Sequence, residues 1–183
     1  MSSSERALRP RIAGLLALVL LGGCTVSPMY GKSSQAALAT GGSGQSLGDL
    51  RGQIAVAPAN TRTAQLFRNA LLFRLNGGTT PTAPVYEIRY SATGQENVVS
   101  IERGSGVPAA SLYRMDATYQ VVRLSDQKVI DSGLRFASVP FDRSEQLFAS
   151  SRALIDAREL AAKEVAEKVQ LGAAVAIRKD LRK

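Results

Sequence analysis

Apolar and polar residues alternate most regularly between Leu112 and Leu124. Strict alternation with a period of two predicts a β-strand with one buried face and one face toward water or a polar partner. The apolar face is expected to hold Tyr113, Met115, Ala117, Tyr119 and Val121, and the opposite face Arg114, Asp116, Thr118 and Gln120.

The segment 125–128, Ser-Asp-Gln-Lys, is typical of a tight turn and predicts that the chain reverses there. The following residues, 129–141, are expected to return as a second strand, which gives a hairpin. In this return strand Ile130, Leu134 and Phe136 alternate with Asp131, Gly133 and Arg135.

Two earlier segments also predict strands. Residues 53–57 are short and apolar and end at Pro58. Residues 85–92 place Tyr86, Ile88, Tyr90 and Ala92 on one face, and an extension through Val98, Val99 and Ile101 after a break at Gly94 is left open. Residues 103–108 are predicted to form a loop.

Helical spacing appears in two places. Ala64, Phe67, Leu71 and Leu75 form the apolar stripe of a first helix. Asn60 or Thr61 is suited to cap its start, and Asn-Gly-Gly at 76–78 is suited to end it.

A second, longer stripe begins near Ala153 and comprises Leu154, Ala157, Ala161, Val165 and Val169. Residues 142–145 have the spacing of a capping box, so this helix is expected to start there or at Ser150 or Ser151. Gly172 is expected either to end the helix or to weaken it.

The order strand, helix, three strands, helix predicts a single α+β domain at 50–183. About four strands form its sheet, and two amphipathic helices pack on one face. The other face is expected to be polar and mixed in charge rather than apolar. Its predicted members are Arg114, Asp116, Thr118 and Gln120, with Arg89 and Arg135 as further candidates.

The N-terminus has the pattern of an export signal. Three arginines precede an uncharged run, 12–21, which is about half the length that a membrane-spanning helix needs. Gly22, Gly23 and Cys24 follow and resemble the lipobox of bacterial lipoproteins. That resemblance implies a signal peptide at 1–23 and a covalent lipid on Cys24. The alternatives are an ordinary signal peptide and a buried apolar helix.

Thr25 stands where many enteric lipoproteins carry the acidic residue that retains them in the inner membrane. The same resemblance therefore implies the outer membrane, with the protein facing the periplasm. Residues 24–49 are rich in Ser, Gly, Ala and Gln and are expected to form a flexible tether.

The composition limits which binding partners and which kinds of active site the chain can have. Removal of the signal peptide lowers the formal net charge from +8 to +6, and 17 of the 23 basic residues are arginine. Arginine favours phosphate and carboxylate partners, although export argues against nucleic acid. The chain has no histidine and one cysteine, which excludes a histidine-containing triad, a Cys–His zinc site and a disulfide framework. No cofactor is expected, and an enzyme is disfavoured because no motif groups its carboxylates or a Ser–Lys pair.

Several segments together resemble the LptE family of lipopolysaccharide-assembly lipoproteins, in its alphaproteobacterial form. They are Gly23-Cys24 with 28–31 (Pro-Met-Tyr-Gly), 68–71 (Arg-Asn-Ala-Leu), 86–89 (Tyr-Glu-Ile-Arg), 113–122, 148–149 and 156–158. No single motif is specific, but their order and spacing cover essentially the whole mature chain.

The resemblance implies a non-enzymatic protein that plugs the lumen of the outer-membrane barrel LptD, assists its assembly, and helps lipopolysaccharide reach the cell surface. It also implies that Arg103, in the loop before the third strand, meets lipopolysaccharide. Charge and placement add Arg114, Lys128 and Arg152 as weaker candidates. The family's basic residue is absent at 148–151, where Arg152 is the nearest substitute.

A rival interpretation keeps the anchor, the tether and the small domain but changes the partner. In that case the protein is an envelope lipoprotein that binds or activates a peptidoglycan synthase, or binds the cell wall itself. Co-purification with a barrel separates the two interpretations. An enzyme would need a pocket with converging polar groups.

Overall fold

The computed structural model describes residues 51–101, 108–143 and 146–182. In chain order they form β1 (Ile54–Val56), α3 (Arg62–Asn76), β2 (Tyr86–Ile101), β3 (Pro108–Arg123), β4 (Lys128–Asp142) and α4 (Leu147–Leu181). The predicted order of strands and helices is confirmed. The predicted signal peptide, Cys24, the tether and Arg103 lie outside the described residues.

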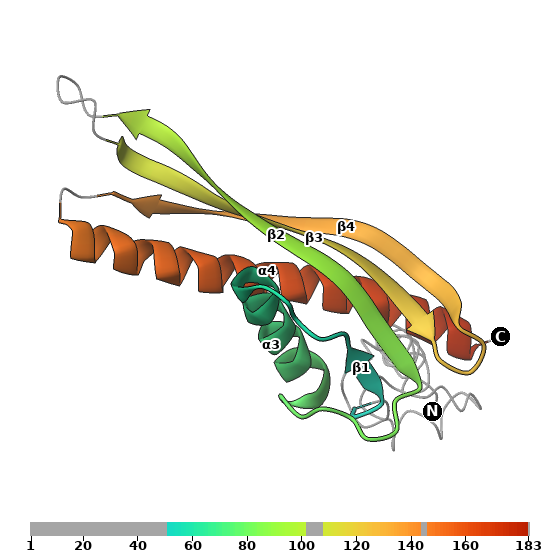
Figure 1. The fold of residues 1–183 in the computed structure, drawn as a ribbon. Helices are drawn as coiled ribbons and strands as arrows, with labels where there is room; N and C mark the ends of the chain where they lie inside the picture. The colour runs from blue at the N-terminus through green and yellow to red at the C-terminus, as the bar shows by residue number, and fades with distance from the viewer. Residues whose placement is uncertain (1–50, 102–107, 144–145, 183) are drawn as a thin grey trace, which may run out of the picture.

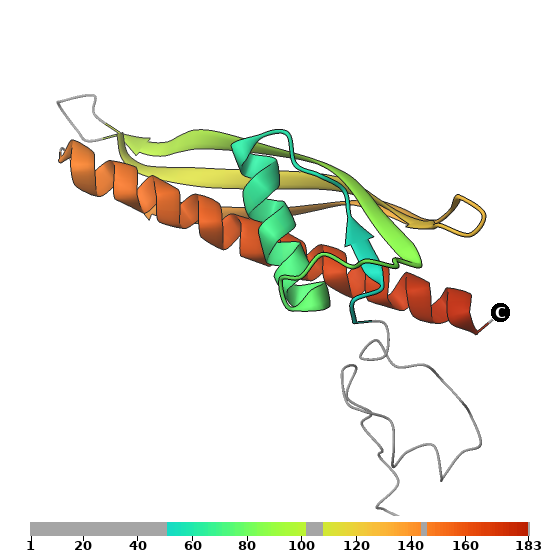
Figure 2. The same ribbon diagram turned by 60° about the horizontal axis from the view of Figure 1, so that its bottom comes forward.

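The strands form one sheet in the order β1-β2-β3-β4. β1 pairs with β2 in parallel, and the longer strands pair antiparallel. Both helices cover the same face of this sheet, with α4 running along its length and α3 crossing α4 (Figures 1 and 2). The predicted α+β architecture, with two helices on one face, is confirmed. We call the uncovered side the open face.

Local signals at both ends of α3 behave as predicted. The Thr61 hydroxyl accepts a hydrogen bond from the Ala64 amide at 3.1 Å, which caps the helix start. Gly77 adopts the left-handed conformation at the helix end, with φ 68°. The predicted stripe of Ala64, Phe67, Leu71 and Leu75 is buried.

β3 supplies the centre of the core. All five residues of its predicted apolar face are buried against the helices, and Arg114, Asp116, Thr118 and Gln120 lie on the open face. Residues opposite one another on neighbouring strands point to the same side of a sheet. The faces of β3 therefore fix the faces of both its neighbours.

The break expected at Gly94 does not occur, because β2 pairs continuously with β3 through this residue. Gly94 lies opposite Met115 and beside the ring of Tyr113. A Cβ here would overlap the Tyr113 hydroxyl and lie 2.7 Å from the ring carbon Cζ. The glycine marks close packing of an aromatic ring rather than the end of a strand.

The expectation that Arg135 lies on the open face was wrong. Arg135 pairs with Ala117, which points toward the helices, so Arg135 shares that side. Leu134 and Phe136 are instead exposed on the open face, at 54% and 47%. The apolar inner positions of β4 come later, at Ala137, Val139 and Phe141.

The long helix differs from its prediction at its start. α4 begins at Leu147 after Gln146, which makes no side-chain capping bond, so neither expected start is correct. At the other end α4 continues through Gly172 to Leu181, so of the two expectations for Gly172 the one that ended the helix there is wrong. A Cβ at Gly172 would overlap the hydroxyl of Tyr119, which explains why a glycine stands inside a helix.

The two long edges of the sheet differ. On β4, the carbonyl of Leu134 accepts a hydrogen bond from Arg135 at 2.9 Å, and that of Phe136 accepts one from Lys168 at 2.7 Å. Pro140 contributes no amide hydrogen to that edge. On the other side, β1 covers β2 only from Tyr86 to Ile88, and no other described strand pairs there.

Candidate functional site

The residues predicted to bind lipopolysaccharide do not form one cluster among the described parts of the chain. Arg114 lies in the middle of β3, on the open face. Lys128 begins β4, beside the turn that follows β3, whereas Arg152 lies near the start of α4. The turn and the start of α4 are at opposite ends of the molecule (Figure 1).

Arg114 has its own carboxylate partner. Its guanidinium donates to both oxygens of Asp116, at 2.9 Å and 3.0 Å, and lies 4.2 Å from the ring centroid of Phe136. The hydrogen bond with Asp116 raises the pKa of Arg114 above its ordinary value. Its charge is therefore already compensated within the sheet.

Arg152 is paired more loosely. Its Nε lies 3.4 Å from Asp156, one helical turn away, and both side chains are mainly exposed. Exposed pairs of this kind contribute little free energy. Arg152 is therefore free to exchange this partner for another anion.

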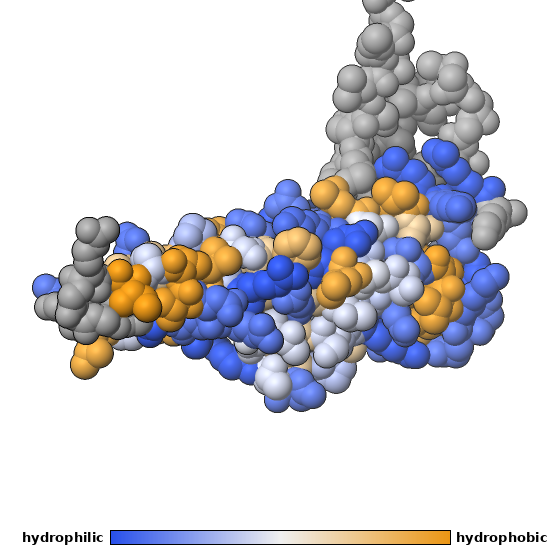
Figure 3. Space-filling view, turned by 90° about the horizontal axis from the view of Figure 1, so that it is seen from above, coloured by the Kyte–Doolittle hydropathy of each residue, from blue (hydrophilic) through white to orange (hydrophobic). Residues whose placement is uncertain are grey.

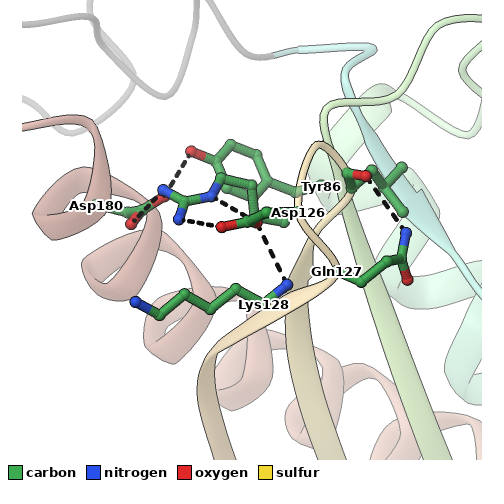
Figure 4. Close-up of polar contacts among 7 residues, drawn as sticks. Tyr86, Asp126, Gln127, Lys128 and Asp180 are labelled. Carbon is green, nitrogen blue, oxygen red and sulfur yellow. Dashed lines mark hydrogen bonds and ion pairs between the residues drawn. The ribbon is translucent and has the colours of Figure 1, made fainter.

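Arg123 organises the end of the molecule near Lys128. It binds Asp126 in the turn at 2.8 Å and Asp180 on α4 at 2.9 Å, and the hydroxyl of Tyr86 donates to Asp180 at 3.2 Å (Figure 4). The hydrogen bond with Arg123 lowers the pKa of Asp126 to about 2. Burial, followed by the charge of Asp180, raises the pKa of Tyr86.

This cluster ties the hairpin turn to the last turns of α4, and sequence reasoning missed it. Arg123 and Asp180 are far apart in sequence, so no local spacing signals the contact.

Exposed apolar side chains gather at the opposite end. We call this group the apolar tip; it comprises Val98, Val99 and Ile101 at the end of β2 and Leu147 and Phe148 at the start of α4. Leu147 and Phe148 are 86% and 87% exposed. Figure 3 shows hydrophobic surface at this end of the molecule.

A group of exposed apolar residues commonly marks an interaction site. The sequence signal for the tip was the pair of adjacent valines in β2, which departs from strict alternation.

A groove lies between β4 and the C-terminal half of α4. It has a volume of about 520 Å³ and is lined by Lys128 together with Arg135 and Lys179. Only Lys128 was a predicted site residue. Among the described residues, no three His, Cys, Asp or Glu side chains are grouped as a metal site, and no helix is both long and apolar enough to span a bilayer.

The layering of two helices on one face of a four-stranded sheet defines an α+β class with solved representatives. The chain is similar to a "putative lipoprotein" from Caulobacter crescentus CB15, with 24% identity and a TM-score of 0.59 over 70% of this chain and 93% of that one. It is also similar to the rare lipoprotein B from Shewanella oneidensis, with 12% identity and a TM-score of 0.52 over 72% and 98%. Both likenesses are at the level of the fold.

No family model matches the chain, and no curated protein matches it either.

Proposed function

We propose that this protein is a lipid-anchored envelope lipoprotein of the LptE type, without enzymatic activity. It plugs and assists the assembly of an LptD-like outer-membrane barrel and aids lipopolysaccharide transport to the cell surface. The observation that carries this proposal is the shared fold. Two proteins with lipoprotein names match nearly their whole length to this chain, which itself carries a lipobox-like Gly22-Gly23-Cys24 segment.

The apolar tip supports insertion into a partner. Exposure of Leu147 and Phe148 to water is unfavourable by about 25 cal/mol per Å² of apolar surface, and a partner that covers them recovers this free energy. Because the tip lies at one end of an elongated molecule, a surrounding partner can cover it without disturbing the core (Figure 2).

The open face supports a polar surrounding. Arg114 and Asp116 form an ion pair there, and polar Thr118 and Gln120 flank it. The interior of a membrane barrel is polar, whereas its outside is apolar. Exposed Leu134 and Phe136 add apolar contacts to this otherwise polar face.

The candidates for lipopolysaccharide contact differ in whether an acidic side chain already pairs with them. Arg114 and Arg152 have acidic partners, whereas Lys128 has none among the residues that the structure describes. Arg103 stays a prediction from the family resemblance.

The test is a pull-down of the tagged full-length lipoprotein from its own outer membrane in mild detergent, with bound proteins identified by mass. A stoichiometric large barrel that survives high salt supports the proposal. A peptidoglycan synthase in its place, or no barrel, overturns it.

Two variants sharpen this pull-down. Leu147→Ser with Phe148→Ser is expected to reduce barrel recovery, because it removes the apolar tip of α4. Lys163→Gln, on the exposed side of the same helix, is the matched control and is expected to leave recovery unchanged.

A further inference from the structure

The groove between β4 and α4 lies at the end opposite the apolar tip. Its cavity of about 520 Å³ is in the size range of small-ligand sites. Its apolar lining consists of Val129 and Ile130 from β4 and Val175 and Ala176 from α4. The other lining residues are charged except for Gly172.

The three cations of the groove lack acidic partners. Lys128, Arg135 and Lys179 line it from two elements, and none of them makes an ion pair with any described residue. Figure 4 shows Lys128 extending from the hairpin turn toward α4. The two lysine amines, and the guanidinium donors of Arg135 beyond the one that binds the Leu134 carbonyl, are suited to an anion.

The two carboxylates of the groove are occupied by other donors. Asp131 accepts a hydrogen bond from the hydroxyl of Tyr119 at 2.9 Å. Asp180 is held by Arg123, and its side chain is 6% exposed. Arg123 therefore neutralises Asp180, whereas the uncharged hydroxyl of Tyr119 leaves the charge of Asp131 in place. Three cations against this one carboxylate still leave the groove positively charged.

The side chain of Arg135 is held in place by its neighbours in the groove. Its guanidinium lies 5.6 Å from the centroid of the Tyr119 ring and donates to the Leu134 carbonyl. A Cβ at Gly133 would lie 3.2 Å from one of its terminal nitrogens, and a Cβ at Gly172 would lie 3.4 Å from the other. Two glycines on facing elements thus leave room for this side chain.

We propose that the groove binds a phosphate-bearing amphiphile, with the phosphate on Lys128, Arg135 and Lys179 and the apolar part against Val129 and Val175. Three cations complement a phosphate dianion better than a single carboxylate. The cavity is larger than a free phosphate, and its apolar lining suits an attached hydrocarbon chain. This site is separate from the apolar tip. It extends the candidate lipopolysaccharide contact of Lys128 in the proposed function, but it does not rest on the proposed barrel partner.

The experiment uses the full-length lipoprotein in non-ionic detergent, titrated with hexyl phosphate by calorimetry at low ionic strength. Inorganic phosphate and hexanol test the two halves of the probe separately. We expect hexyl phosphate to bind more tightly than either half. Replacement of Lys128→Gln and Lys179→Gln together is expected to weaken its binding by roughly tenfold or more, because two charge-assisted contacts are lost.

Lys163→Gln on α4 is the matched control and is expected to change the affinity by less than about twofold, since this exposed lysine lies outside the groove. Arg135→Lys keeps the charge but loses the planar fork and is expected to give an intermediate loss. Circular dichroism of each variant confirms that the fold is retained.

Displacement identifies the natural source of the phosphate. Bilayer phospholipid and lipopolysaccharide are each added as competitors for bound hexyl phosphate, and either one displacing it supports the proposal. Equal binding by the double lysine variant overturns it, as does failure of hexyl phosphate to bind. Stronger binding of an acidic peptide than of any phosphate also overturns it, in favour of a protein ligand.

Discussion

The strand β2 begins inside the core and ends outside it. Its two ends therefore allow a comparison of the two ends of the molecule. Tyr86 and Ile88 are buried, whereas every residue from Thr93 to Ile101 is exposed. At the first end β1 and α3 cover the strand, and the Arg123 contacts join the hairpin turn to α4. At the other end, the apolar tip is left uncovered.

The difference separates residues that hold the fold from residues available to a partner. Apolar side chains at the enclosed end are explained by the core they form. Those of the tip are exposed to water and contribute little to the folded state. The two groups should therefore respond differently to the same substitutions.

The largest contrast is expected between two phenylalanines. Phe67→Ala removes a fully buried ring from α3 and is expected to lower the free energy of unfolding by about 3–5 kcal/mol. Phe148→Ala, at the tip, is expected to change it by less than about 0.5 kcal/mol. Denaturant titration of both variants measures the difference, and equal losses would mean that the tip is part of the core.

Two arginines give the next contrast. Arg123→Gln leaves the nearly buried carboxylate of Asp180 without its cation and is expected to cost about 2–3 kcal/mol. Arg114→Gln breaks a more exposed pair and is expected to cost less than about 1 kcal/mol. The same titrations measure both, and a larger loss for Arg114→Gln would contradict this account.

Two glycines that lie beside tyrosine rings allow the packing of these rings to be compared. Gly172→Ala is expected to cost about 1–2 kcal/mol, because the new methyl group meets the Tyr119 hydroxyl. In a Tyr119→Phe background that overlap is gone, and alanine's higher helix propensity should make the same change neutral or stabilising.

Gly94→Ala should not be rescued in this way by Tyr113→Phe, since the ring carbon Cζ would still lie 2.7 Å from the new methyl group. Double-mutant cycles on thermal unfolding separate the two cases. Rescue at both glycines would show that only the hydroxyl groups matter.

The smallest expected effect on stability is that of low pH, through the carboxylate of Asp126. The pKa of Asp126 lies at about 2 in the folded protein against an ordinary value of 3.8, so its carboxylate stabilises the fold above pH 3.8. This contribution is lost as the pH falls from 3.8 to 2. Asp126→Asn should lower Tm at pH 6, and its deficit relative to the unmodified protein should vanish near pH 2.

Local sequence signals predicted much of the fold. The alternation in β3 identified its buried face, because each residue there has neighbours on both sides and one face against the helices. The Thr61 cap was predictable because capping depends on residues three positions apart. The face of β4 was missed because its apolar alternation begins only at Ala137.

The remaining errors concern contacts between distant segments. A break was expected at Gly94, and a helix end was one of two expectations at Gly172. The tyrosine rings that explain both glycines come from β3, which no local pattern reveals. The groove was invisible for the same reason, since Lys128, Arg135 and Lys179 come together only when α4 packs on β4. Of the predicted site residues, Lys128 alone lines the groove.

The occupied edge of β4 limits how copies of the chain can associate. Carbonyls of Leu134 and Phe136 are already taken by Arg135 and Lys168, so a second sheet cannot readily add along that side. Among the described residues, β2 beyond Ile88 is the other long edge, and no strand or side chain is seen to occupy the carbonyls of that edge. Pairing of two copies through these edges would consume both at once and stop at a dimer. A monomer with a single available edge cannot propagate into a fibre by that route.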